Sequence, residues 1–376
     1  MKSRLALAVV IFAISGMALL AQSSAKPHLN PMVDLLLQHK PVFGVYFPGP
    51  QNLPGATPPP ANAQGGGGGR GAGAPLRVAD GYPQQEDPCG EAMGLIKNPE
   101  KSVPLTADEA KVRDEIAKFA LTHKEPDYLF SGDLEGGIDR APTARGPSPF
   151  PAFTRLLKTL STSGHVVPVM MKSPKIGCDL KTAGDAVSRE LSLGITGLMF
   201  PHTQSAKELQ AGLAAMRPKS KGGTRSDDIG QAAQIWGLTP QQYKEKADLY
   251  SMNPNGELVN FTIIEDKEGL AHVREIAKTK GIGVLWPGAG TLGGVFYKNN
   301  GQGNWVRDDE AWEKSIQTIL SACKEFNVPC GYPSNNWDDP RGGMELRMKQ
   351  GFSVFVSGWS DAAFAGMNNG KKAASR

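Results

Sequence analysis

Short apolar runs alternate with helix-like segments along most of this chain. Eight of these runs have the length and apolar content of buried β-strands. They are residues 42–47, 128–131, 166–171, 197–200, 259–266, 282–286, 328–332 and 352–356. Eight strands that alternate with helices predict a parallel (β/α)8 barrel, or TIM barrel, whose working face is formed by the carboxyl ends of the strands.

Helices are expected between the strands, and two of them begin with a recognisable signal. Thr106 followed by Glu109, and Ser205 followed by Glu208, have the spacing of capping boxes. The expected helices are residues 107–121, 150–160, 184–193, 206–216, 268–278, 309–325, 344–349 and 361–365. A longer segment, residues 217–258, separates the fourth helix of this barrel pattern from the fifth strand. We expect it to pack on the outside of the barrel or to bridge protomers.

The composition suits one globular domain without a polyanionic partner. The chain has 376 residues, of which 41 are basic and 37 acidic, so its formal charge is only +4. This balance and the lack of long basic runs predict neither a nucleic-acid nor a membrane-surface partner. Hydrophobic residues make up 40% of the chain, and a barrel of about 250 residues with insertions fits the length.

The amino terminus has the three parts of a secretory signal peptide. Lys2 and Arg4 are followed by an apolar stretch, residues 5–20, and by small residues at positions 23–25. A membrane anchor is the alternative, but the apolar stretch is short for a membrane span. We therefore expect residues 1–25 to be removed on export to the periplasm or the outside of the cell. Residues 26–376 then form the mature barrel, which no second long apolar run holds in a membrane.

A Pro/Gly-rich tract, residues 48–75, follows the first strand. Because this composition cannot bury a core, we interpret residues 48–103 as an insertion in the first βα loop, flexible at least over residues 52–74. The alternative is a linker between two domains. It is the weaker interpretation, because only about twenty residues of the mature chain precede the tract.

The four cysteines, Cys89, Cys178, Cys323 and Cys330, do not have the spacing of a zinc site. Cys89 and Cys178 both fall in predicted loops above the working face. Because an exported protein folds in an oxidising compartment, we predict a disulfide between these two.

Polar residues follow most of the predicted strands. They are Asp133, Glu135, Lys172, His202, Glu265, Asp266, Thr291, Asn335, Asn336, Ser360 and Asp361. Two or three carboxylates with a histidine around one cavity are what a divalent cation needs. For each residue alone, a helix cap or a salt bridge is the alternative. Glu265 stands out because its strand is otherwise apolar, and an unpaired buried carboxylate is unfavourable.

Residues 288–293 satisfy the pattern GxGxxG after the sixth strand. A dinucleotide site would use this pattern after an early strand and continue directly into a helix. Here residues 295–305 have the composition of a loop. We therefore favour a turn whose successive backbone N–H groups bind an anion such as a carboxylate.

Several segments resemble a known family. They are residues 30–45, 127–136, 194–216, 259–269 and 281–293. These segments are similar to the HpcH/HpaI aldolase/citrate lyase family, which are metal-dependent 2-keto-acid aldolases. The most specific are residues 198–206 with the following helix, and the fifth strand ending in Glu265. The resemblance implies a (β/α)8 barrel, usually oligomeric, that cleaves or forms a carbon–carbon bond next to pyruvate through a divalent-metal enolate.

The resemblance also assigns roles to individual positions. Glu265 matches the family's metal-binding glutamate. The family's second ligand is an aspartate in a Gly-Pro-Ala-Asp turn, where this chain has Thr291, or Gly290 with a gap. The family's histidine after the second strand falls at or near Glu135, and its arginine falls near Met171 or Lys172. These departures affect the reaction more than the fold.

Two residues are candidates to compensate for these departures. His202 is a candidate metal ligand or base, because a neutral imidazole titrates near working pH; the alternative is a histidine that caps the next helix. Lys172 is a candidate cation for stabilising an enolate, although it lacks the bidentate geometry of arginine.

These assignments give one function and two alternatives. We expect an exported carbon–carbon lyase that acts on a pyruvate-derived keto acid, works with Mg, Mn, Co or Zn and forms a homo-oligomer. Glu265 and Asp133 would bind the metal, Glu135 or His202 would move the proton, and Lys172 would stabilise the enolate. The residues expected to bind the substrate carboxylate are Gly288, Ala289, Gly290, Thr291 and Leu292. The alternatives are a non-catalytic barrel that binds a keto or sugar acid, and metal-assisted hydrolysis or isomerisation.

Overall fold

The computed structural model describes the residues that form the barrel and most of its surrounding helices. The described residues are 27–55, 78–79, 82–83, 89, 106–132, 134–135, 149–161, 167–302 and 305–376. The predicted signal peptide, most of the predicted insertion and Asp133 lie outside these ranges, so the predictions made for them remain predictions.

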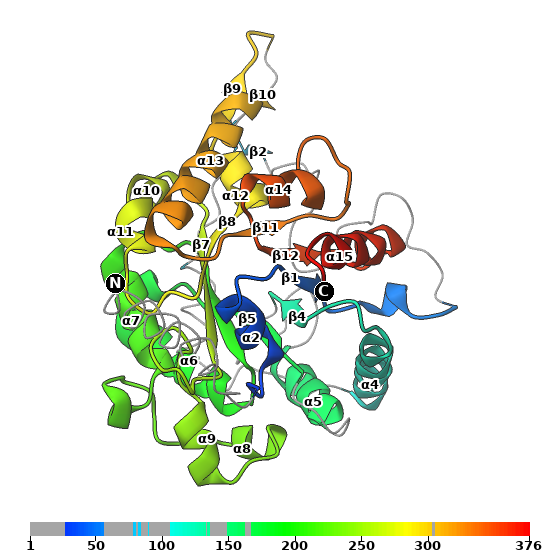
Figure 1. The fold of residues 1–376 in the computed structure, drawn as a ribbon, viewed down its shortest axis with the longest axis vertical. Coiled ribbons are helices and arrows are strands. Elements are labelled where there is room, and N and C mark those ends of the chain that lie inside the picture. The colour runs from blue at the N-terminus through cyan, green and yellow to red at the C-terminus, as the bar shows by residue number, and fades with distance from the viewer. Residues whose placement is uncertain are drawn as a thin grey trace, which may run out of the picture.

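Eight parallel strands form a nearly closed barrel (Figure 1). The strands are β1 (Val42–Tyr46), β4 (Tyr128–Ser131), β5 (Val169–Lys172), β6 (Gly197–Phe200), β7 (Val259–Ile264), β8 (Val284–Pro287), β11 (Gly331–Pro333) and β12 (Val354–Ser357). They are hydrogen-bonded in the order β11-β12-β1-β4-β5-β6-β7-β8. The predicted (β/α)8 fold and its eight strands are confirmed, although β5, β8, β11 and β12 begin later than predicted.

The two end strands of this sheet, β8 and β11, meet at a seam. An isolated bridge joins Leu285 to Cys330, and the Leu285 N–H donates to the Pro329 carbonyl at 3.0 Å. A disulfide joins Cys330 to Cys323 beside this seam. The predicted disulfide between Cys89 and Cys178 is confirmed, whereas the one at the seam was not predicted.

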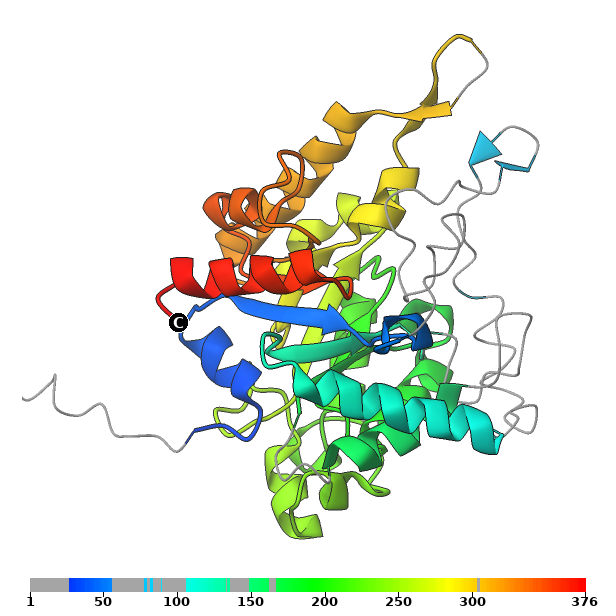
Figure 2. The ribbon, with the colours of Figure 1, turned by 90° about the vertical axis from the view of Figure 1, so that its right-hand side faces the viewer.

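Helices surround the strands (Figures 1 and 2). The longer helices are α4 (Ala107–Thr122), α5 (Pro149–Ser161), α6 (Leu180–Ser192), α7 (Ala206–Met216), α13 (Asp309–Phe326) and α15 (Asp361–Ala373). The shorter ones are α2 (Pro31–Leu37), α8 (Ala232–Ile235), α9 (Pro240–Lys246), α10 (Lys267–Ala271), α11 (Val273–Ala277), α12 (Ala289–Gly294) and α14 (Met344–Gln350), with 3-10 turns η1 (Pro50–Asn52), η4 (Ile176–Cys178) and η5 (Lys219–Lys221). The main apolar core lies between the helices and the strands, with members such as Leu129, Leu157, Val187, Leu213, Ile316 and Phe355.

Local capping explains where several helices begin. Thr106 and Glu109 form the predicted capping box of α4. Ser205 caps α7 as predicted, but the Glu208 carboxylate accepts from other N–H groups, so the box is not closed there. The Asp179 side chain caps α6, which makes this helix begin earlier than predicted.

Other boundaries differ from the predictions because of turns that the hydrophobic pattern does not show. The helix predicted at residues 268–278 is divided into α10 and α11 at His272. Helix α15 continues to Ala373, well beyond the predicted end. Residues 295–305, predicted as a loop, include strand β9 (Tyr297–Asn299). It pairs antiparallel with β10 (Trp305–Arg307), and this hairpin projects from the barrel (Figure 2).

The amino-terminal end of the barrel is closed by α2. In Figure 2, β1 and β4 run towards the right, and α2 lies on the left, where these strands begin. Met32, Val33 and Leu36 of α2 are buried against apolar side chains of the strands. This helix begins where the Asn30 side chain accepts from the Met32 N–H at 3.1 Å.

The long segment between α7 and β7 packs on the outside of the barrel, which is one of the two predicted alternatives (Figure 1). The Arg217 guanidinium makes two bonds to the Asp248 carboxylate, at 2.9 and 3.2 Å. The Trp236 indole N–H donates to the Gly194 carbonyl, and the Tyr243 hydroxyl donates to the Leu191 carbonyl. The segment is therefore attached to the end of α6.

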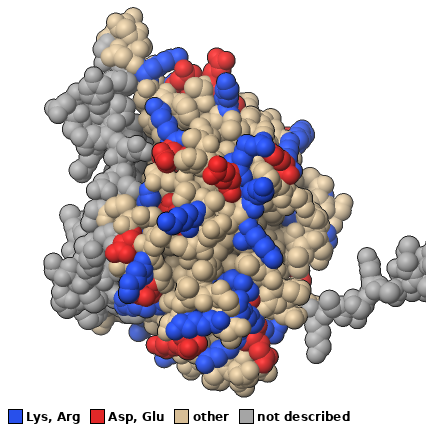
Figure 3. All heavy atoms as spheres, turned by 90° about the vertical axis from the view of Figure 1, so that its left-hand side faces the viewer, with Lys and Arg blue, Asp and Glu red and all other residues tan. Residues whose placement is uncertain are grey.

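The surface in Figure 3 mixes the two signs of charge, with acidic side chains lying among the basic ones. Among the described helices, none combines the length and apolar character that crossing a membrane requires.

Candidate active site

Four charged or titratable side chains meet at the carboxyl ends of four consecutive strands. Glu135 follows β4, Lys172 ends β5, His202 follows β6 and Glu265 follows β7. One potential ligand atom from each of Glu135, His202 and Glu265 lies within 4.8 Å of the other two. The sequence analysis singled out all four, and the fold brings them together.

Glu265 is at the centre of this cluster and is only 2% exposed. Every residue of β7 is buried, so the carboxylate that follows the strand is held inside the barrel rim. Its Oε2 accepts from the backbone N–H of His202 at 3.0 Å. A Cβ on Gly288 would lie 2.3 Å from Glu265 Cγ, so only glycine leaves room for this side chain.

The charge of Glu265 is stabilised by its neighbours. Burial raises the pKa of Glu265, but Lys172, His202 and the Thr291 hydroxyl lower it, and the net pKa lies below the usual value. Glu265 is therefore ionised at neutral pH, as a cation ligand must be.

Lys172 lies between two carboxylates. Its Nζ is 3.2 Å from Glu135 Oε1 and 3.5 Å from Glu265 Oε1. Burial lowers the pKa of Lys172, but the charges of Glu265 and Glu135 raise it by more than burial lowers it. The pKa of Lys172 therefore lies well above its usual value. Partial burial raises the pKa of Glu135, and Lys172 offsets this only in part. The cluster thus contains a fixed ammonium and a carboxyl group that is easier to protonate than usual.

His202 is held in an unusual backbone conformation, with φ of 47°. The left-handed region is unfavourable for a residue with a Cβ, by roughly 1–2 kcal/mol. In this conformation its Nε2 lies 3.6 Å from Glu265 Oε2, and its Nδ1 lies 3.7 Å from Asp266 Oδ2. Burial lowers the pKa of His202, but Asp266 and Glu265 raise it more, so the imidazole is protonated more readily than usual.

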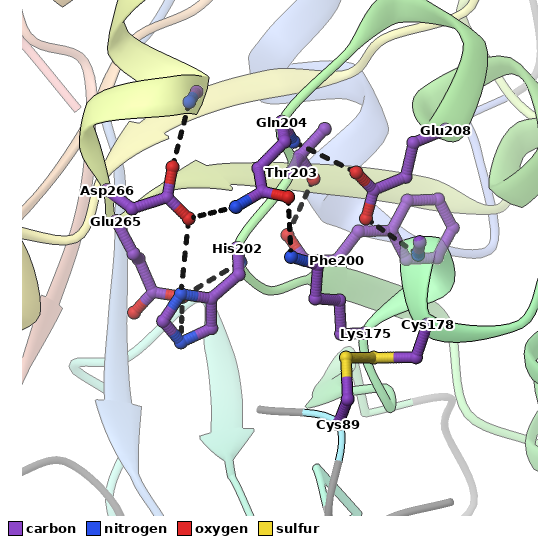
Figure 4. A network of polar contacts seen from close by, with 12 residues as sticks. Cys89, Lys175, Cys178, Phe200, His202, Thr203, Gln204, Glu208, Glu265 and Asp266 are labelled. Atoms are coloured by element: carbon purple, nitrogen blue, oxygen red, sulfur yellow. Dashed lines mark hydrogen bonds and ion pairs between the residues drawn. A yellow bond between two sulfur atoms is a disulfide. The ribbon is translucent and has the colours of Figure 1, made fainter. Parts of the chain in front are cut away.

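A network of polar contacts connects His202 to Asp266, Gln204 and Glu208 (Figure 4). Asp266 caps α10 through the Gly269 N–H and accepts from the Gln204 side-chain amide at 2.9 Å. The Gln204 N–H donates to Glu208 Oε2 at 2.9 Å, and the Gly177 N–H donates to Glu208 Oε1 at 2.8 Å. Gly177 lies in η4 directly before the disulfide-bonded Cys178, so this network runs from the disulfide to the imidazole.

Tyr46 belongs to the site although the sequence analysis did not single it out. It ends β1, and its hydroxyl lies close enough for Lys172, Glu265 and Glu135 to act on it. Burial raises the pKa of Tyr46, so the phenol stays protonated and can donate a hydrogen bond. The signal was available, because Tyr46 lies within the predicted first strand, near its carboxyl end.

The segment predicted as an anion-binding turn is the short helix α12. Gly288 precedes this helix, and the Leu292 N–H donates back to the Gly288 carbonyl at 2.7 Å. Thr291 interacts with Glu265 through its hydroxyl. The first N–H groups of a helix have no intrahelical partner, so Ala289 and Gly290 still offer donors near Glu265.

Two other predicted residues make hydrogen bonds within the local structure. Asn335 Oδ1 accepts from the Gly358 N–H at 2.6 Å, and the Ser360 side chain caps α15. Asp361 lies in the first turn of that helix. Asp133, predicted as a metal ligand, lies outside the described residues.

The cluster fits a divalent cation in its donor types. Carboxylate oxygens suit Mg and Mn, and a neutral imidazole nitrogen suits Zn. Glu265, Glu135 and His202 would supply them from three strands of one rim.

Comparisons with known proteins agree with this architecture. No protein-family model and no curated protein sequence matches the chain significantly. The structure is similar to that of an HpcH/HpaI aldolase/citrate lyase family protein from Burkholderia cenocepacia J2315, with a TM-score of 0.53 and 15% identity over 92% of this chain and 97% of that chain.

Two further solved structures have lower scores. For an HpcH/HpaI aldolase from Desulfitobacterium hafniense DCB-2, the TM-score is 0.46 at 15% identity, over 90% of this chain and 95% of that chain. For the citrate synthase SbnG, it is 0.48 at 14% identity, over 93% and 98%. The resemblance seen in the sequence is confirmed at the level of the fold: this chain has the (β/α)8 fold of an HpcH/HpaI aldolase/citrate lyase protein.

Proposed function

We propose that this chain is an exported carbon–carbon lyase of the 2-keto-acid aldolase type. One observation carries the proposal: Glu265, Lys172, Glu135 and His202 meet at the carboxyl ends of four consecutive strands. The working face of a (β/α)8 barrel is the end at which they meet. The shared fold with HpcH/HpaI proteins supports the choice among the reactions that barrels perform.

Glu265 would hold a divalent cation together with Glu135 or His202, and Asp133 stays a further predicted ligand. Such an ion, when bound, polarises the keto and carboxylate oxygens of a substrate. The N–H groups at the start of α12 that have no intrahelical partner would contact the substrate carboxylate.

The chain's own residues supply the rest of the chemistry. When the carbon–carbon bond breaks, its electron pair moves into the pyruvate part and forms an enolate. The fixed ammonium of Lys172 offsets this charge. Glu135 and His202 both have a raised pKa, which suits proton transfer at neutral pH. Whichever of the two does not hold the ion would take the proton from the substrate hydroxyl and return one to the enolate carbon.

The test is release of pyruvate from 4-hydroxy-2-oxo acids by the mature protein, residues 26–376. Turnover should require one of Mg, Mn, Co or Zn and should fall in Glu265→Gln. Glu268→Gln, an exposed glutamate on α10, is the matched control. Absence of turnover with all four ions would reject the lyase.

A non-catalytic barrel that binds a keto or sugar acid is the second candidate. Thr291, rather than a carboxylate, lies beside Glu265, so the carboxylate pair of the family is incomplete at this position. Tight binding of a keto acid without turnover, unchanged in Glu265→Gln, would favour this candidate.

Export is supported by residues 1–25 and by the cysteines. All four cysteines are paired, in Cys89–Cys178 and Cys323–Cys330, as suits an oxidising compartment. Mass measurement of the secreted protein tests it, because a chain beginning near residue 26 is expected. Size-exclusion chromatography with light scattering tests the proposed homo-oligomer.

A further inference from the structure

The two carboxylates proposed to bind a metal already have a cation beside them. The Lys172 ammonium lies 3.2 Å from Glu135 and 3.5 Å from Glu265, and its side chain is only 14% exposed. Its backbone is held by the sheet, since Lys172 is the last residue of β5 and pairs with Met199 of β6, while the preceding Met171 pairs with Ser131 of β4. The ammonium cannot leave the cluster without losing both partners inside the barrel rim.

The charge balance of the cluster shows what a second cation would meet. Two carboxylates and one ammonium leave one net negative charge when His202 is neutral. A divalent ion bound to the same carboxylate oxygens would lie close to the ammonium, where like charges repel strongly at low dielectric. It would also take away the carboxylate oxygens that stabilise the buried ammonium.

We propose that Lys172 is an internal competitor of the divalent ion for Glu135 and Glu265, and that it sets the metal affinity of the site. This inference rests on the ligand set of the proposed function, but not on any reaction. The competition also couples the binding of the ion to the binding of the substrate. An anionic substrate gives the ammonium a new partner and releases the carboxylates, so substrate and ion should strengthen each other's binding, by the same factor in both directions.

The test measures Mn binding by isothermal calorimetry. Lys172→Met removes the charge and keeps a similar length. It should bind Mn at least tenfold more tightly than the wild type, which corresponds to about 1.4 kcal/mol. Lys175→Met is the matched control: this nearby lysine is also buried, but its ammonium contacts the Gln204 amide oxygen, not a carboxylate. Its Mn affinity should stay within about threefold of the wild type.

A second experiment measures Mn affinity in the presence of pyruvate. Mn affinity should rise at least fivefold with pyruvate in the wild type, and by less in Lys172→Met. A folded Lys172→Met whose Mn affinity is unchanged or weaker overturns the proposal, as does an equal effect of pyruvate on both proteins.

If Lys172→Met does not fold, the wild type itself supplies the answer. Lysine labelled with 13C at Cε reports the environment of each ammonium by NMR, and Lys172→Arg identifies the resonance. Competition predicts that Mg shifts the Lys172 resonance, and an unmoved resonance at saturating Mg overturns it. Because no arm uses turnover, loss of the lyase activity and loss of this proposal are separate outcomes.

Discussion

The two ends of the barrel belong to the same eight strands, but apolar side chains close one end and charged side chains gather at the other. At the amino-terminal end, α2 buries Met32, Val33 and Leu36 against apolar strand residues. At the carboxyl end, the charged side chains of Glu265 and Lys172 lie close together and are largely buried. The first arrangement gains free energy from burial, whereas the second places ionised groups where burial is unfavourable. The comparison predicts that changes at one end affect stability and changes at the other affect binding and chemistry.

The largest effect is expected from Glu265→Gln. The amide keeps the size of the side chain and its place beside the His202 N–H, but loses the charge that attracts a cation. Mn affinity and turnover should fall at least a hundredfold, or about 2.7 kcal/mol, while the melting temperature changes little. Calorimetry and thermal melting measure the two. Unchanged Mn affinity would exclude Glu265 as a ligand.

The next effect is expected at the opposite end, from Met32→Ala. Met32 is fully buried beneath the strands, so the variant leaves a cavity and should lose about 2 kcal/mol of unfolding free energy. Denaturant unfolding measures it. Leu37→Ala, an exposed position on the same helix, is the control and should lose under about 0.5 kcal/mol. Mn affinity should be that of the wild type, and a large loss of affinity would contradict the separation of the two ends.

A smaller effect is expected from Asn30→Ala. The Asn30 side chain accepts from the Met32 N–H, and its amide donates to the Glu257 carbonyl at 3.0 Å. Losing this cap and bond should lower the unfolding free energy by about 1–2 kcal/mol. Asn30→Ser keeps an oxygen for the cap and should lose about half as much. Equal losses in both variants would mean that the cap contributes nothing.

The smallest effect is expected at a second buried carboxylate, Glu190 in α6, which can be compared with Glu265. Among the described residues neither of its oxygens has a hydrogen-bond partner, and burial raises its pKa well above the usual value. The pKa of Glu190 is therefore higher in the folded protein than in the unfolded chain. As a result, the free energy of unfolding has its full value below the pKa of the unfolded state and falls as pH rises towards the pKa of the folded state. Glu265, with Lys172 beside it, has the opposite shift.

Glu190→Gln removes this pH dependence. The variant should therefore be more stable than the wild type at pH 8 and nearly equal to it at pH 5. Unfolding free energies at the two pH values measure it. Asp185→Asn, exposed on the same helix, should show no such difference. A constant difference at both pH values would show that Glu190 does not take up a proton on folding.

The strands could be predicted because apolar runs are local features of the sequence. Glu265 was also visible, since a carboxylate at the end of an otherwise apolar strand has few structural roles. The distances between side chains on neighbouring strands could not be predicted from the sequence. That Lys172 reaches two carboxylates depends on the barrel order β4-β5-β6-β7 and on the path of each loop.

Residues that sequence patterns missed share one property: their roles depend on neighbours far along the chain. Tyr46 is a half-buried aromatic at the end of β1, and its place in the site is set by Lys172 and Glu265 on other strands. The left-handed backbone of His202 is not encoded by a glycine, so nothing in the local sequence indicated it. The hairpin β9–β10 was missed because each of its strands has only 3 residues.

The disulfide between Cys89 and Cys178 turns part of the chain into a covalent ring, with a sequence separation of 89. Glu135 and Lys172 lie inside this ring, whereas His202 and Glu265 lie beyond it. A single protease cut between Glu135 and Lys172 would therefore leave these two residues on different fragments that the disulfide still joins. Reduction would then separate the fragments on a denaturing gel. The cluster around Glu265 thus has a covalent link that does not depend on an intact backbone.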